Sequence, residues 1–84
     1  MTHQYQADAN ITEQQYKNIW AIVPKAAAVV DEYEWMEDCV EAVAEELGIE
    51  IEWKLMGRIT SAIDLYLKGS DLVDECIQYG FTIR

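Results

Sequence analysis

The stretch from residue 24 to residue 47 has the strongest pattern in the chain, because its apolar residues recur at spacings of three and four. This spacing places apolar side chains on a single face of an α-helix. Pro24 suits the first turn of a helix, and Gly48 stands where a left-handed residue commonly ends one. We therefore predict one long helix over residues 24–47, with a break near Asp31 as the alternative. The apolar positions are Ala26, Val29, Tyr33, Met36, Val40, Val43 and Leu47.

Local signals predict an earlier helix as well. Thr12 and Gln15 have the spacing of a capping box, and Ile11 with Tyr16 has the spacing of a hydrophobic staple. We expect this helix to stop before Pro24, because proline removes a backbone donor and clashes with the preceding turn.

The apolar period changes after Gly48. Ile49, Ile51 and Trp53 alternate with glutamates, which is typical of a short strand with one buried face. On this pattern Trp53 belongs to the core.

Two further helices and a second strand are predicted in the C-terminal part. Helical spacing returns from residue 55 until Gly69, and Ser70 can cap another short helix that ends at Gly80. Residues 81–84 alternate again, so this second strand could pair with the first. The predicted fold is α+β, dominated by helices in the order ααβααβ, with an all-helical bundle as the alternative.

The chain has 84 residues, which is enough for one small domain over residues 1–84. Residues 1–10 are polar and lack periodicity, so we expect a flexible N-terminal arm. No apolar run is long enough to cross a bilayer, and the first residues lack the basic start of a secretory signal. We therefore expect a cytoplasmic protein without a membrane partner. Cys39 and Cys76 are expected to be buried thiols.

The residues needed for common kinds of catalysis are missing. His3 is the only histidine and lies in the polar arm, so a paired nucleophile and base is not expected. The glycines are scattered, and no phosphate-binding loop is present. Among the many carboxylates, Glu34, Asp38 and Glu41 are the best candidates for cation ligands, but EF-hand spacing is absent. We predict a protein that is not an enzyme and has no cofactor or dedicated metal site.

The formal net charge of −10 comes entirely from the centre of the chain. No Lys or Arg occurs between Lys25 and Lys54, whereas ten acidic residues do. Such a charge counts against direct binding of nucleic acid or of anionic membranes, and it favours a basic protein surface as partner. The ten residues are Asp31, Glu32, Glu34, Glu37, Asp38, Glu41, Glu45, Glu46, Glu50 and Glu52.

Helical geometry groups half of these acids into one stripe opposite the apolar stripe of the predicted long helix. The like charges repel one another at i, i+4 spacing and weaken the helix, which favours a binding role for them. Trp35 borders the stripe and could anchor an interface. The predicted partner-binding residues are Asp31, Glu34, Trp35, Asp38, Glu41 and Glu45.

In size, charge and lack of catalytic groups the chain resembles the small acidic inhibitors encoded by phages and mobile elements, the anti-restriction and anti-CRISPR proteins. The resemblance is one of composition and rests on no shared motif. It implies a nucleic-acid mimic that blocks the basic, nucleic-acid-binding surface of a partner in the host-cell cytoplasm. The alternative is a structural or adaptor module that pairs its apolar stripe with a second copy, as a homodimer, or with a partner helix.

Overall fold

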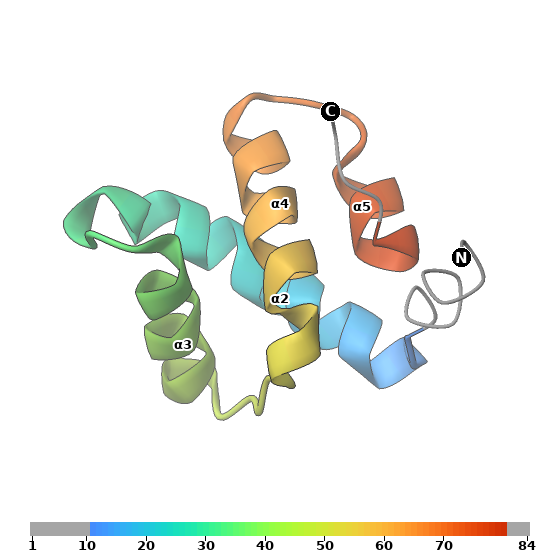
Figure 1. Cartoon of the computed structure of the whole chain (residues 1–84), viewed down its shortest axis with the longest axis horizontal. Helices are drawn as coiled ribbons and strands as arrows, with labels where there is room; N and C mark the ends of the chain where they lie inside the picture. Colours follow the sequence, from blue (N-terminus) through green and yellow to red (C-terminus); the bar gives the residue numbers. More distant parts are fainter. Residues whose placement is uncertain (1–10, 81–84) are drawn as a thin grey trace.

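A computed structural model describes residues 11–80, so the predicted arm (residues 1–10) and the predicted second strand (residues 81–84) lie outside the described residues. The described part contains four α-helices and two short 3₁₀ turns, but no strand. The predicted α+β class is therefore wrong, and the described residues form the all-helical bundle that was the alternative. The elements, labelled as in Figure 1, are α2 (Glu13–Val29), η1 (Val30–Glu32), α3 (Met36–Leu47), η2 (Trp53–Leu55), α4 (Met56–Leu67) and α5 (Val73–Tyr79).

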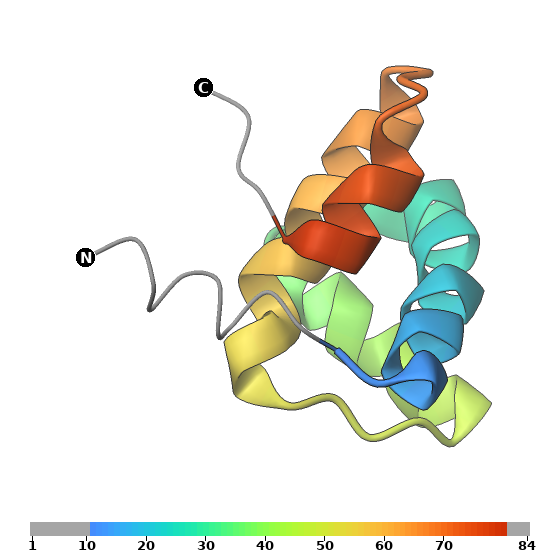
Figure 2. The ribbon, with the colours of Figure 1, turned by 90° about the vertical axis from the view of Figure 1, so that its right-hand side faces the viewer.

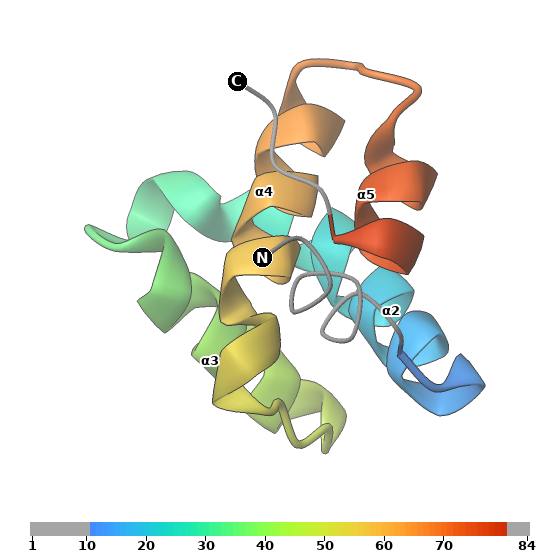
Figure 3. The ribbon, with the colours of Figure 1, turned by 45° about the vertical axis from the view of Figure 1, so that its right-hand side comes forward.

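Helix α4 occupies the centre of the bundle, where it crosses α2 and has α3 on one side and α5 on the other (Figures 1 and 3). Helix α2 also contacts α3 and α5. Seen from the side, the segment between α3 and α4 runs as an open connection along one edge of the bundle (Figure 2). The core consists of aliphatic side chains from all four helices, among them Ile19, Ile22, Val23, Val40, Ile59, Ile63 and Ile77.

The predicted capping box at the start of α2 is confirmed. The backbone N–H of Gln15 donates to Thr12 Oγ1 at 3.0 Å, and the backbone N–H of Thr12 donates to Gln15 Oε1 at 2.9 Å. These two bonds satisfy backbone donors that the first turn of a helix leaves without partners. Ile11 and Tyr16 both pack half-buried against the core.

Helix α2 continues through Pro24 to Val29, so the predicted stop before Pro24 is wrong. Residues on both sides of the proline, such as Val23 and Ala26, are completely buried. Their burial offsets the hydrogen bond that proline removes from the helix.

The predicted single helix over residues 24–47 is also wrong, and the break near Asp31 is correct. The backbone leaves the helix at η1 and becomes extended at Tyr33, and α3 begins at Met36. This reversal lets α3 fold back onto α2 and bury Val40 and Val43, which a continuous helix would carry away from α2.

The predicted strand from residue 49 is absent, although its alternation persists. Ile49 and Ile51 pack half-buried against the core, while Glu50 and Glu52 are exposed. No strand within residues 11–80 pairs with this segment, so it remains an extended connection. The alternation ends at Trp53, because η2 begins there and buries Leu55 instead. Trp53 is 70% exposed, and its predicted core position is wrong.

Glycines end α3 and α5 at the predicted positions. Gly48 and Gly80 have φ values of 73° and 69°, which are favourable only for residues without a Cβ. A Cβ at Gly80 would also collide with the buried Arg58, whose Nη1 donates to the carbonyl of Ile77 at 3.0 Å. The predicted cap Ser70 lies ahead of α5, where its Oγ accepts from the N–H of Leu72 at 3.0 Å and forms a turn into the helix.

A carboxylate joins the first and last of these helices. Asp74 on α5 accepts hydrogen bonds from the hydroxyl of Tyr16 at 2.5 Å, from the indole N–H of Trp20 at 3.1 Å and from the side chain of Gln78 at 2.6 Å. The bond from Tyr16, followed by that from Trp20, holds the pKa of Asp74 below its ordinary value. The same bond to Asp74 raises the pKa of Tyr16.

Replacing Gly80 or Gly48 by alanine compares how much each glycine at a helix end contributes to stability. A Cβ at Gly48 has open space, so Gly48→Ala should cost only the left-handed backbone penalty of about 1 kcal/mol. A Cβ at Gly80 would lie 2.5 Å from Arg58 Nη2, so Gly80→Ala should lower the free energy of unfolding further. Urea unfolding of both variants measures the difference, and equal losses would contradict the contact with Arg58.

Replacing Asp74 by asparagine should lower the free energy of unfolding by about 1–2 kcal/mol at pH 7. Because the pKa of Asp74 is lowered by folding, its ionised form stabilises the fold above the unfolded pKa of about 3.9. This contribution is lost as the pH falls through the lower pKa of the folded state. The stability difference between wild type and Asp74→Asn, measured by urea unfolding across this range, should therefore shrink in acid. A difference that stays constant would rule out the role of the charge.

Candidate functional site

The acidic residues of the central segment all lie on the surface. Each of the ten acids between residues 31 and 52 is exposed, as expected for carboxylates that have no cation to accompany them into the core. Asp38, Glu41 and Glu45 share one face of α3, and we call these three residues the acidic face of α3. Asp31 lies in η1 and Glu34 in the turn that follows, so the structure does not place them on the predicted single helical stripe.

Most of this negative charge has no partner within the bundle. Among the described residues, the ten central acids form a single ion pair, between Glu52 and Lys54 at 3.7 Å, with both side chains exposed. The other ion pairs in residues 11–80 involve acids outside the central segment, Glu13 with Lys17 and Asp64 with Lys68. The acidic centre of the chain is thus largely uncompensated in the fold.

Helix α3 carries charges that partly oppose its own stability. Acids in its first turn favour the helix dipole, but Glu45 and Glu46 lie at the negative end, where the last turn has no basic residue. The i, i+4 pairs Glu37/Glu41 and Glu41/Glu45 repel each other on the helix. Glu34 and Asp38 do not form such a pair, because Glu34 precedes α3.

Large aromatic side chains are exposed next to the acids. Trp35 is 61% exposed at the N-terminus of α3, which places this predicted partner-binding residue on the surface. Trp53 is more exposed still, and sequence reasoning missed it because a period of two predicts a buried position. Tryptophan is enriched among the residues that dominate binding energy at protein interfaces, so both are suited to such contacts.

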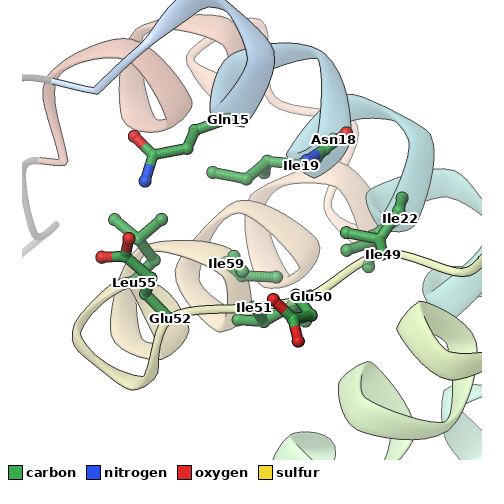
Figure 4. Close-up of a pocket in the computed structure, with 10 residues that line it drawn as sticks. All are labelled: Gln15, Asn18, Ile19, Ile22, Ile49, Glu50, Ile51, Glu52, Leu55 and Ile59. Carbon is green, nitrogen blue, oxygen red and sulfur yellow. The ribbon is translucent and has the colours of Figure 1, made fainter.

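A cavity of about 480 Å³ opens between α2 and the segment that joins α3 to α4 (Figure 4). Aliphatic side chains and polar groups from α2 and from the joining segment contribute equally to its lining. On the other side of this segment a second hollow of about 250 Å³ is lined by Glu41, Glu45, Trp53 and neighbouring apolar side chains. The sequence analysis predicted neither hollow. The one signal in the sequence that pointed toward them was the alternating segment from residue 49, for which no strand partner was certain.

The described residues offer little for metal or covalent chemistry. No group of three or more His, Cys, Asp or Glu side chains in residues 11–80 is arranged to hold a metal ion, and the candidates Glu34, Asp38 and Glu41 form no such group. Cys39 and Cys76 are buried, as predicted. Burial raises the pKa of both thiols, and the charge of Glu32 raises that of Cys39 further, so both stay protonated and weakly nucleophilic at neutral pH. His3 lies outside the described residues.

The apolar stripe that the alternative function requires is used inside the molecule. Val40 and Val43 are buried in the core, and Met36 and Leu47 pack half-buried against it. Pairing with another helix through these residues would require the bundle to open.

Comparison with protein families, curated proteins and solved structures finds no match to this chain. None of the helices in residues 11–80 combines the length and the apolar character needed to cross a membrane.

Replacing Glu41 by glutamine should stabilise the fold. The change removes two like-charge pairs on α3, and each costs a few tenths of a kcal/mol, so the free energy of unfolding should rise by about 0.5 kcal/mol at low ionic strength. The gain should shrink in salt. Glu13→Gln is the control, because it removes an acid that is paired with Lys17 at 3.6 Å and should destabilise slightly. A loss of stability in Glu41→Gln, measured by urea unfolding, would show that the acids of α3 do not repel one another.

Proposed function

We propose that this protein is a non-enzymatic binding protein that presents its acidic central segment to a basic, nucleic-acid-binding surface of another protein. It would inhibit that protein by occupying the surface sterically and electrostatically, in the cytoplasm. The observation that carries the proposal is the exposure of ten acids that have almost no cationic partners among residues 11–80. A basic surface is the natural complement of such a charge distribution.

The spacing of charge along α3 supports a mimic of nucleic acid. Five acids occur in the 12 residues of α3, and at about 1.5 Å per residue they give roughly one charge per 3.6 Å. One strand of duplex DNA carries one charge per about 3.4 Å. A groove lined with Lys and Arg that accepts a phosphate backbone therefore meets a similar charge density on this helix.

The repulsion among the acids of α3 also favours a binding role for them over a role in solubility alone. Lysines interleaved with the glutamates would keep the surface equally soluble and would support α3 through i, i+4 pairs. The chain instead accumulates like charges on α3 and places exposed tryptophans beside them. Such aromatic side chains can supply the apolar contacts that charge alone does not provide.

Two charge-matched variants test the proposal. The first neutralises three of the ten central acids with Glu34→Gln, Asp38→Asn and Glu41→Gln. The second removes the same charge elsewhere with Glu13→Gln, Asp71→Asn and Glu75→Gln, so both have the same net charge. Each protein is immobilised and used to capture proteins from a bacterial lysate at low salt, and the captured proteins are challenged with duplex DNA.

The proposal predicts a partner that wild type and the second variant retain, that the first variant loses, and that duplex DNA or high salt releases. Equal retention by both variants would show that total charge, and not the central segment, determines capture. The absence of any partner released by duplex DNA would contradict the mimicry itself.

A further inference from the structure

The cavity beside α2 is a half-open groove with aliphatic side chains at its base and polar groups around its rim. Ile19 and Ile22 of α2 face Ile59 of α4 across it, and Ile51 and Leu55 complete the opposite wall (Figure 4). Its volume of about 480 Å³ lies in the range of pockets that bury small ligands or side chains. An apolar side chain entering this space would contact mainly the half-buried Ile49 and Ile51, because Ile19, Ile22 and Ile59 are at most 2% exposed.

The rim of the cavity carries hydrogen-bond donors on one side and negative charge on the other. The carbonyl oxygens of Gln15 and Asn18 already accept bonds, from Thr12 N–H and from Gln14 Nε2 respectively. The side-chain amide nitrogens of Gln15 and Asn18 have no hydrogen-bond acceptor within residues 11–80. In Figure 4 the amide nitrogen of Gln15 points toward Leu55. Glu50 and Glu52 supply exposed carboxylates from the joining segment, and the carboxylate of Glu52 lies 3.7 Å from Nζ of Lys54 in an exposed ion pair.

The backbone of the joining segment offers a further set of donors. Hydrogen bonds fix its two ends, from Ile49 N–H to the carbonyl of Ala44 at 2.8 Å and from Leu55 N–H to the carbonyl of Glu52 at 2.9 Å. Between them, the N–H groups of residues 50–52 have no partner in the part of the chain that is described. An extended backbone with unpaired groups is a template on which another extended segment can form main-chain hydrogen bonds.

We propose that this groove binds an extended segment of the partner protein in which an aliphatic side chain is flanked by Lys or Arg. The aliphatic side chain enters the cavity, and the flanking cations pair with Glu50 and Glu52. The inference rests on the proposed function and specifies where on the acidic segment the partner binds. Charge complementarity favours a basic segment, because acids lie on both sides of residues 49–53. Glu50 and Glu52 line the cavity, and Glu41 and Glu45 line the second hollow on the other side.

A synthetic peptide with alternating Lys and Leu residues is the probe, and a peptide with alternating Lys and Ser residues is its charge-matched control. Binding to the full-length ¹⁵N-labelled protein is followed by amide chemical shifts. The Leu peptide should shift the backbone amides of residues 49–55 and the side-chain amides of Gln15 and Asn18. The Ser peptide should bind about tenfold more weakly or worse, because it lacks the side chain that the cavity buries.

Variants at the rim separate the cavity from the surrounding charge. Asn18→Phe places a ring at the mouth and should weaken binding of the Leu peptide about tenfold, whereas Asn18→Ala leaves the cavity open and should weaken it much less. The double variant Glu50→Gln, Glu52→Gln changes only exposed side chains and should reduce the binding of both peptides.

Equal affinity for the two peptides, with shifts confined to α3, would overturn the groove while leaving the proposed acidic binding function intact. Unchanged affinity of Asn18→Phe, or no binding of either peptide, would also overturn it. Failure of the proposed function is distinguished by the capture experiment, whose dependence on Glu34, Asp38 and Glu41 does not involve the groove.

Discussion

The burial of α4 against the other three described helices is the interaction on which the rest of the structure depends. Ile59 and Ile63 of α4 are almost completely buried, and α2, α3 and α5 each contact this helix. A chain of 84 residues has only one core to fill, so the apolar face of each helix must reach α4 or a neighbour that packs on it. The turn at η1, which brings α3 back onto α2, follows from this requirement, because a straight helix would leave half of its apolar stripe in water.

The same requirement determines where the charge can lie. Once the apolar stripe of α3 faces the core, Asp38, Glu41 and Glu45 must face solvent, and their mutual repulsion cannot be relieved by cations from within the bundle. The fold tolerates this repulsion because the core holds α3 in place irrespective of the helix's own preference. A basic partner surface would relieve this repulsion when it binds. The repulsion that destabilises α3 in the free protein would therefore favour the binding that we propose.

The local signals of caps predicted the start of α2 and the end of α3, whereas the stop at Pro24 was predicted wrongly and packing over longer distances could not be predicted. The capping box at Thr12 and the terminal glycine Gly48 each depend on a few neighbouring residues, and both predictions are confirmed. The helix continues through Pro24 because burial on both sides outweighs a local penalty. The alternation from residue 49 predicted a strand, but a strand needs a partner, and none exists within residues 11–80. The exposure of the acids followed from their charge, whereas the exposure of Trp53 and the cavity beside α2 depend on how distant elements meet.

The central claim is that the acidic segment binds its partner through its charges. The most direct test is the equilibrium affinity for a captured partner over a series of salt concentrations, measured for wild type and for the variant that neutralises Glu34, Asp38 and Glu41. If the claim is correct, the affinity of wild type falls steeply with salt, and that of the variant starts lower and falls less steeply, because fewer screened contacts are lost. Parallel salt dependences for the two proteins would contradict the claim.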